Sequence, residues 1–85
     1  MKENRISRNT REVSNGGTKV LLSYTTPVAA RSETLLVRTS TQWSQTTNRH
    51  IKKWLGGDFA QSIQVPQRRV DDIYYRTLHY SMTRL

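Results

Sequence analysis

The stretch that decides the fold is TKVLLSYTTPVAARSETLLVRT, residues 18–39. Larger side chains occupy every second position near its start: Val20, Leu22 and Tyr24. This period of two predicts a strand with one buried face. Residues 28–30 and 34–39 predict a second and a third strand, which the polar segment 31–33 joins. Because the connections are short, the three strands predict an antiparallel meander.

An amphipathic helix is predicted to follow the meander. Ser44 is the expected N-cap and Gly56-Gly57 the expected stop, because serine accepts a first-turn amide and glycine adopts a left-handed conformation. On a helical wheel, one face carries Thr47, Ile51, Trp54 and Leu55. The opposite face carries Arg49, Lys52 and Lys53. We therefore expect the apolar face to lie on the sheet and the cations to face solvent.

A second helix is predicted from Pro66 toward the C-terminus. Residues at helical spacing follow the proline: Val70, Ile73, Tyr74, Thr77, Leu78 and Ser81. Asp71 and Asp72 near its start and Arg84 near its end match the helix dipole. Between the two helices, residues 58–65 fit either a loop or an irregular strand.

Residues 1–15 are polar and charged, with few larger apolar side chains. Such a segment buries too little apolar surface to offset the entropy of ordering, so we expect a flexible basic arm. Residues 16–85 then form a single small domain. The expected fold class is α+β: a three-stranded antiparallel meander packed by one amphipathic helix, with a second helix near the C-terminus.

The composition excludes several classes of protein. The 85 residues include 14 Lys and Arg against 6 Asp and Glu, for a formal charge of +8, and no cysteine. Without cysteine there is no disulfide, thiolate metal site or thiol nucleophile. No apolar run approaches the roughly 20 residues that cross a bilayer, and the first residues lack a signal-peptide pattern, so we expect an intracellular protein without a membrane partner. The positive charge instead favours nucleic acid or an acidic protein as the partner.

The densest positive charge lies in residues 41–55, which contain no acid and carry Arg49, Lys52 and Lys53. Exposed helices ordinarily mix charges of both signs, so this segment favours contact with phosphate or an acidic surface over a merely solvated face. Other cations are expected to extend the patch or to add non-specific affinity: Lys19, Arg31 and Arg38 in the strands, and Arg5, Arg8 and Arg11 in the arm.

The aromatic residues have mainly structural interpretations. Trp54 is expected in the core, and Trp43 is expected as a lid on the core rather than as a platform for stacking bases. Tyr75 and Tyr80 lie away from the apolar stripe of the second helix. They are expected as anchors at an interface, where tyrosine is enriched.

No catalytic or metal-binding pattern accompanies these residues. The only histidines are His50 and His79, and a metal site needs three or four ligands at suitable spacing. Asp71-Asp72 is the only pair of adjacent acids, and neighbouring positions on a helix point in different directions. The serine motifs of hydrolases do not occur. We therefore expect a binding protein with no catalytic residues, no metal and no cofactor, and not an enzyme.

Two blocks of the sequence resemble a known pattern. Ser23–Ala29 reads SYTTPVA and Trp43–Leu55 reads WSQTTNRHIKKWL. Together they resemble S-Y-x-T-P-V-A … S-x-T-T-x-x-H-I-x-x-W-L, the pattern of a family of small uncharacterised proteins encoded by bacteriophages and related mobile elements. The resemblance implies a phage-type origin, and hence the cytoplasm of a bacterial host, but no activity. The basic arm and the Tyr-rich tail lie outside it.

The matched positions Thr46, Thr47 and His50 are hard to explain by packing alone. If the helix begins at Ser44, their polar groups and the first-turn amides form a candidate anion site. We expect a small phage-type accessory protein that acts by binding, with nucleic acid as the leading partner. The alternative is a protein-interaction module that inhibits or redirects a host protein, for example a bacterial defence or replication component. Exposed strand edges also leave room for a symmetric homodimer.

Overall fold

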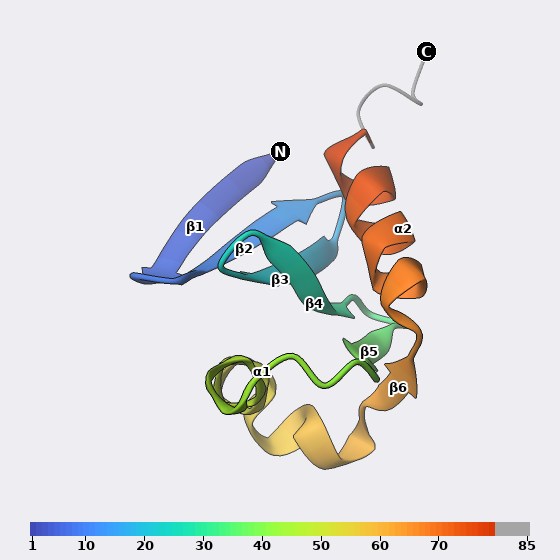
Figure 1. The fold of residues 1–85 in the computed structure, drawn as a ribbon. Helices are drawn as coiled ribbons and strands as arrows, with labels where there is room; N and C mark the ends of the chain where they lie inside the picture. The colour runs from blue at the N-terminus through green and yellow to red at the C-terminus, as the bar shows by residue number, and fades with distance from the viewer. Residues whose placement is uncertain (80–85) are drawn as a thin grey trace.

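A computed structural model of the protein describes residues 1–79 and contains one six-stranded sheet and two α-helices (Figure 1). The strands lie in the sheet in the order in which they follow one another along the chain. The α+β class expected from the sequence is confirmed. The elements are β1 (Lys2–Ser7), β2 (Thr10–Asn15), β3 (Thr18–Ser23), β4 (Thr26–Arg31), β5 (Leu36–Thr39), α1 (Gln45–Leu55), the 3-10 helix η1 (Gly56–Gln61), β6 (Ile63–Val65) and α2 (Gln67–Leu78).

The sheet is mixed and larger than the predicted meander. β1 to β5 pair in antiparallel, whereas β6 lies parallel to β5, with Arg38 opposite Gln64. The meander corresponds to β3, β4 and β5; the sequence analysis missed β1 and β2 and left β6 as one of two alternatives. A parallel pair requires a crossover connection, which α1 and η1 supply between β5 and β6. Residues 58–65, interpreted as a loop or a strand, contain most of η1 and all of β6.

Residues 1–15, expected as a flexible arm, instead form the β1–β2 hairpin. β2 pairs with β3 along its whole length, from Thr10 to Asn15. Thr10 and Val13 of β2 are buried, whereas every residue of β1 is exposed. The expectation was wrong because it weighed only the apolar surface of the segment itself. Backbone hydrogen bonds to β3 hold the hairpin, and the composition of the segment does not show them.

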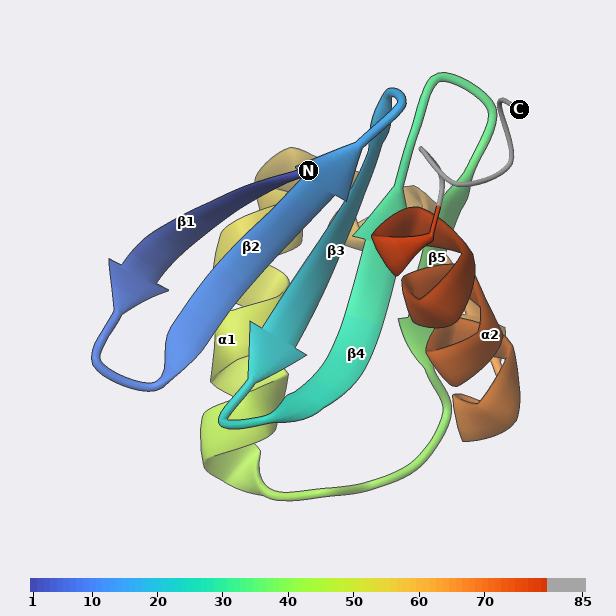
Figure 2. The ribbon, with the colours of Figure 1, turned by 90° about the horizontal axis from the view of Figure 1, so that it is seen from above.

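The two helices pack on opposite faces of the sheet (Figure 1, Figure 2). The core under α1 is formed by Leu21, Val28, Ala29, Ile51 and Leu55. The core under α2 is formed by Val20, Ala30 and Val37, with Ile73 and Tyr74 packed against it. β3 is therefore covered on both faces. The prediction of a strand with one buried face was wrong because it did not place the second helix on the sheet.

The first helix, α1, begins and ends where the sequence predicts. The Ser44 side chain accepts a hydrogen bond from the Thr47 amide at 3.1 Å, and Gly56 follows the helix with a φ of 56°. Ile51 and Leu55 are buried against the sheet, and the three cations of the helix are exposed. The predicted orientation of this amphipathic helix is confirmed.

The second helix, α2, follows Pro66, which occupies its N-cap position. Its adjacent acids interact within the helix. Asp71 accepts a hydrogen bond from the side-chain Nε2 of Gln67, and Asp72 forms an ion pair with Arg76 at 3.0 Å. Both acids therefore have partners on their own helix. The expected roles of three residues near the C-terminus fall outside the described range: Tyr80, Ser81 and Arg84.

Candidate functional site

Two of the three cations of α1 line different cavities. Arg49 and Lys53 are one helical turn apart and share a side of the helix. Lys53 lines a cavity of about 430 Å³ between α1 and the β1–β2 hairpin. Lys52 lines a smaller cavity, of about 140 Å³, between α1, β5 and η1. Lys52 and Lys53, which the sequence groups on one face with Arg49, therefore line two different cavities, whereas Arg49 lines neither.

The larger cavity combines apolar side chains with a cation. Its lining comes from the hairpin, β3 and α1, and consists of Ile6, Ser7, Thr10, Leu21, His50, Lys53 and Trp54. The hairpin thus lies beside α1, although a long stretch of chain separates the two. The sequence analysis treated residues 1–15 as separate from the domain, so it did not predict this cavity.

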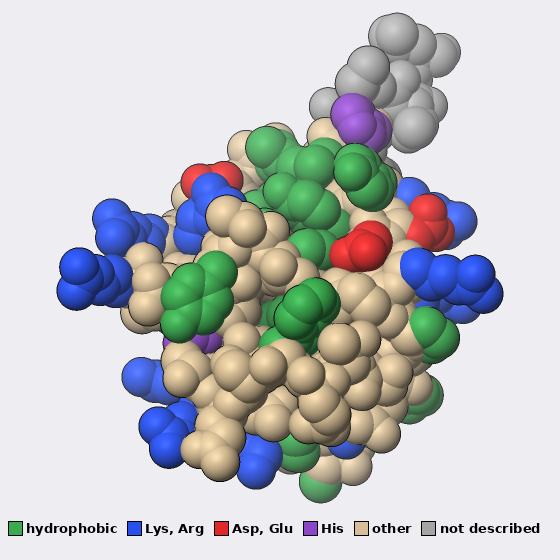
Figure 3. Space-filling model, in the orientation of Figure 1, with side chains coloured by type: hydrophobic (Ala, Val, Ile, Leu, Met, Phe, Trp, Pro, Cys, Tyr) green, Lys and Arg blue, Asp and Glu red, His purple; other side chains and the backbone are tan. Residues whose placement is uncertain are grey.

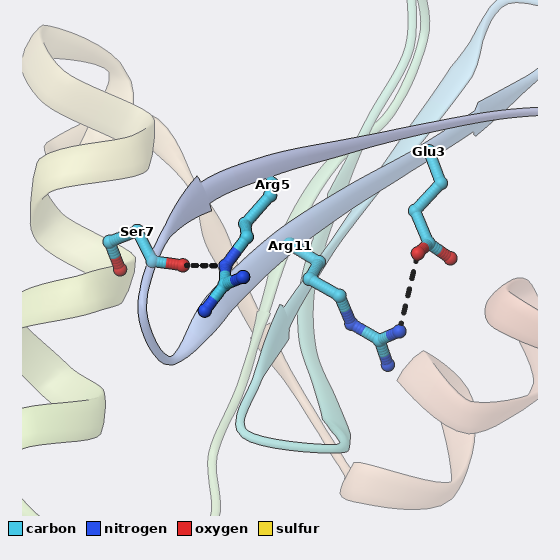
Figure 4. A network of polar contacts seen from close by, with 4 residues as sticks. All are labelled: Glu3, Arg5, Ser7 and Arg11. Atoms are coloured by element: carbon cyan, nitrogen blue, oxygen red, sulfur yellow. Dashed lines mark hydrogen bonds and ion pairs between the residues drawn. The ribbon is translucent and has the colours of Figure 1, made fainter.

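Arg5 and Arg8 carry the positive charge at the tip of the hairpin. Arg8 lies in the turn between β1 and β2, and the Arg5 guanidinium donates from Nε to the Ser7 carbonyl oxygen at 3.3 Å (Figure 4). Lys and Arg side chains follow the left side of the molecule, over the hairpin and α1 (Figure 3). We call Arg5, Arg8, Arg49 and Lys53 the hairpin–helix edge. Within residues 1–79, none of the four forms an ion pair.

Two of the predicted binding cations form ion pairs with acids of the same chain. Arg11 pairs with Glu3 at 3.3 Å, across β1 and β2 (Figure 4). Arg31 pairs with Asp58 at 2.6 Å, and its guanidinium lies 5.8 Å from the centre of the Trp54 ring. Because these carboxylates offset the positive charge nearby, Arg11 and Arg31 attract an anionic partner less than the hairpin–helix edge does.

Lys19 lies at the end of the sheet opposite the hairpin tip. Lys19 is near the start of β3. The other end of β3 leads to Tyr24, whose backbone amide donates a hydrogen bond to the carbonyl oxygen of Asn9 in the hairpin turn. Lys19 lines a cavity together with Glu12 and Glu33. The structure therefore separates Lys19 from the hairpin–helix edge and gives it acidic neighbours.

Arg38 and Lys52 form a second cationic group beside η1. Arg38 lies on the α1 side of the sheet, as does Leu36 two residues earlier, which packs against the core under α1. The Arg38 Cζ is 4.5 Å from the centre of the Phe59 ring, and the Lys52 Nζ is 5.5 Å from it. Arg38 Nε is buried without a hydrogen-bond partner among the described residues.

The polar residues of the candidate anion site take part in a network inside the protein. Thr47 is buried, with its hydroxyl 3.1 Å from Ser23 Oγ, and His50 Nδ1 is 2.8 Å from the same oxygen. Thr46 is exposed. An anion at this helix end would compete with internal hydrogen bonds, and anion binding there stays a prediction. The sequence analysis did not single out Ser23, although its place in the SYTTPVA block was a signal.

Tyr24 lies in the turn after β3 and is not part of the buried alternation that the sequence predicts. Its φ is 60°, the one positive φ of a non-glycine residue in the described part of the chain. The side chain is 52% exposed, and its ring lies 6.1 Å from the His50 ring. Backbone strain of this kind clusters at functional sites. Because its amide is hydrogen-bonded to Asn9 and its side chain is exposed, Tyr24 presents an aromatic ring beside the hairpin tip.

The tryptophans lie at the margins of the cores. Trp54 is half-buried, and its indole N–H donates to Glu12 at 2.8 Å, so it is not wholly inside the core as expected. Trp43 is 49% exposed and donates to Gln67 of α2 at 3.1 Å, which ties the segment before α1 to α2. Tyr75 is exposed on α2, in agreement with the helical wheel.

Within residues 1–79, no group of three or more His, Cys, Asp or Glu residues is placed to hold a metal ion. No helix of that same range combines the length and the apolar character needed to cross a membrane.

The fold and the cation distribution define a small basic α+β domain in which helices cover both faces of a mixed sheet. The chain belongs to the family of unknown function DUF8033, whose family model matches residues 1–73. The match begins at the first residue, so the β1–β2 hairpin is part of the family's domain and not an addition to it. Comparison with curated proteins and with solved structures found no match.

Proposed function

We propose that this protein binds nucleic acid through the hairpin–helix edge, as a phage-type accessory protein acting in the cytoplasm of a bacterial host. The resemblance of the SYTTPVA and WSQTTNRHIKKWL blocks supports the phage-type origin. The observation that carries the binding proposal is that four cations, carried by two distant segments that flank one cavity, form no ion pairs among residues 1–79.

Charge and shape both favour a phosphate backbone as the partner. Lys53 lines a cavity of about 430 Å³, and the other three cations of the edge lie on the two segments that flank it, the β1–β2 hairpin and α1. Neutralising phosphates releases counterions, which makes binding sequence-independent and salt-sensitive. The exposed ring of Tyr24 lies next to the tip of the hairpin and offers a surface on which an unpaired base can stack.

The test is binding of fluorescently labelled oligonucleotides, measured by anisotropy over a range of salt concentrations. For double-stranded DNA, four phosphate contacts give an expected log–log slope of about −3 to −4. Single-stranded DNA and RNA of the same sequence determine which polymer the edge prefers. Absence of binding to all three polymers at low salt would refute the proposal.

Matched variants separate the edge from the total charge of the protein. Lys53→Gln should weaken binding and reduce the salt slope by about 1, because one phosphate contact is lost. Lys19→Gln removes the same charge at the opposite end of the sheet, beside Glu12 and Glu33, and should leave the slope unchanged. Equal effects of the two variants would show that only the net charge matters, not the hairpin–helix edge.

The alternative partner is an acidic host protein that meets the same cations. An affinity purification from nuclease-treated bacterial lysate tests it, with the Lys53→Gln variant as the control. A partner that wild type retains and Lys53→Gln loses, together with no binding to oligonucleotides, would favour this alternative. Loss of every captured protein on nuclease treatment would instead favour nucleic acid.

A further inference from the structure

The cavity between α1, β5 and η1 has the lining of an anion site. It is small, about 140 Å³, and lies on the sheet face that α1 covers. Most of the residues around it offer hydrogen-bond donors: Thr39, Thr41, Gln42, Asn48 and Gln64, with the cations Arg38 and Lys52. Its lining, all within residues 1–79, includes no Asp or Glu. Hydroxyl, amide and cationic donors without an acid suit a ligand that only accepts hydrogen bonds.

The ring of Phe59 keeps the two cations of this cavity close together. Arg38 Cζ and Lys52 Nζ lie 4.5 Å and 5.5 Å from its centre. The two charges are therefore no more than about 10 Å apart, which is about one Debye length at 0.1 M salt. Within residues 1–79, neither forms an ion pair. Two like charges held at this separation repel each other, and an anion between them removes the repulsion.

A second and independent observation is the buried Arg38 Nε. Among the described residues it is the one buried side-chain nitrogen or oxygen without a hydrogen-bond partner. A buried charged donor that lacks a partner is costly, because it has lost water without gaining an acceptor. Arg38 is one of the residues that line the cavity, so we expect an oxyanion bound there to accept from its guanidinium group. Arginine presents its donors as a planar fork that matches the oxygens of phosphate.

We infer that this cavity binds a tetrahedral oxyanion, a phosphate group, between Arg38 and Lys52. The group belongs either to free phosphate or to the backbone of a nucleic acid. The inference does not depend on the proposed function, because Lys52 and Lys53 face different cavities. The backbones of the two cations belong to β5 and α1, and both side chains lie against the Phe59 ring.

The test is a titration of the ¹⁵N-labelled protein with inorganic phosphate, with sodium chloride adjusted to hold ionic strength constant. We expect saturable shifts of the backbone amides of Thr41, Gln42 and Gln64, which surround the cavity. Lys52→Gln and Arg38→Gln should each weaken phosphate binding about tenfold or more, since each removes a charge-assisted contact. Lys53→Gln is the matched control, on the same helix and one residue along, and should change binding less than about twofold.

The outcomes separate the sources of the phosphate and the two proposals. If inorganic phosphate causes no shifts but an oligonucleotide shifts the same three amides, the ligand is a backbone phosphate. If neither causes these shifts, or if Lys53→Gln weakens phosphate binding as much as Lys52→Gln, the inference is wrong. Loss of oligonucleotide binding in Lys53→Gln with phosphate binding intact supports both proposals separately. If Arg38→Gln does not fold, the exposed Lys52 still supplies the test.

Discussion

Ser23 connects two elements through one buried hydroxyl. It lies at the end of β3, and its Oγ is within hydrogen-bond distance of Thr47 Oγ1 and His50 Nδ1 on α1. Ser44 caps the same helix and also donates to the Thr47 hydroxyl. Because this network lies at the first turns of α1, it fixes the start of the helix on the sheet. The orientation of the cations farther along the helix depends on that attachment.

The first prediction concerns this network. Ser23→Ala should destabilise the protein by about 1–2 kcal/mol, because the buried Thr47 hydroxyl and the half-buried His50 ring lose a partner. Urea denaturation followed by circular dichroism measures the change. Ser40→Ala, at an exposed position, is the control and should change stability by less than about 0.5 kcal/mol. Equal stability of Ser23→Ala and wild type would show that the network contributes nothing to folding.

The second prediction concerns the backbone of Tyr24. Asparagine tolerates a positive φ, whereas a β-branched residue does not, so Tyr24→Val should be less stable than Tyr24→Asn by about 1 kcal/mol or more. Both variants remove the ring that lies near His50, so their difference reports the backbone alone. Thermal unfolding of the pair measures it. Equal stability would show that the turn relaxes without cost.

At the scale of elements, the β1–β2 hairpin supplies the side chains that lie next to Lys53 of α1. Its outer strand is exposed throughout, whereas β2 buries Thr10 and Val13 and pairs with β3. The hairpin tip meets the end of β3 through the hydrogen bond between the Tyr24 amide and Asn9. The hairpin lies beside α1, and its Ile6, Ser7 and Thr10 line a cavity together with Lys53.

The third prediction distinguishes a folded hairpin from a flexible arm. Val13→Ala should cost about 1–3 kcal/mol, because Val13 is buried in the folded protein. Ile6→Ala in β1 should cost less than about 1 kcal/mol, since this side chain is half exposed. Urea denaturation of both variants provides the comparison. Were residues 1–15 flexible, both substitutions would be neutral.

At the scale of the whole molecule, the positive charge is unevenly compensated. The total is +8, and three ion pairs are present within residues 1–79. Five of the six acids lie beside Lys19 and Arg31 or on α2, and the sixth, Glu3 of β1, pairs with Arg11. The cations of the hairpin–helix edge and the Arg38–Lys52 pair form no ion pair within residues 1–79. Uncompensated charge destabilises the compact state through self-repulsion and attracts anionic partners.

The fourth prediction follows from this imbalance. Raising sodium chloride from about 20 to about 200 mM should raise the Tm, because repulsion among the cations is screened more than the few exposed ion pairs are weakened. Differential scanning fluorimetry measures the shift. The Arg38→Gln and Lys52→Gln variants, with less repulsion, should show a smaller rise. A Tm that falls with salt would mean that the ion pairs dominate.

The sequence by itself determined the features that depend on neighbouring residues. The limits of α1, its buried Ile51 and Leu55 and its exposed cations follow from capping and helical periodicity. The start of α2 after Pro66 and the three central strands follow in the same way. These features are predictable because capping and periodicity act over a few residues along the chain.

Only the tertiary structure decided which segments meet. It joined residues 1–15 to the sheet, added β6 in parallel and covered both faces of β3. It also brought the hairpin beside Lys53, paired Arg31 with Asp58 and placed Arg38 and Lys52 at the same cavity. Strand pairing runs through backbone groups that every residue carries, so side-chain patterns do not reveal it. The distances between cations depend on that pairing. The number of charges can therefore be read from the sequence, but not which of them lie close together in the folded protein.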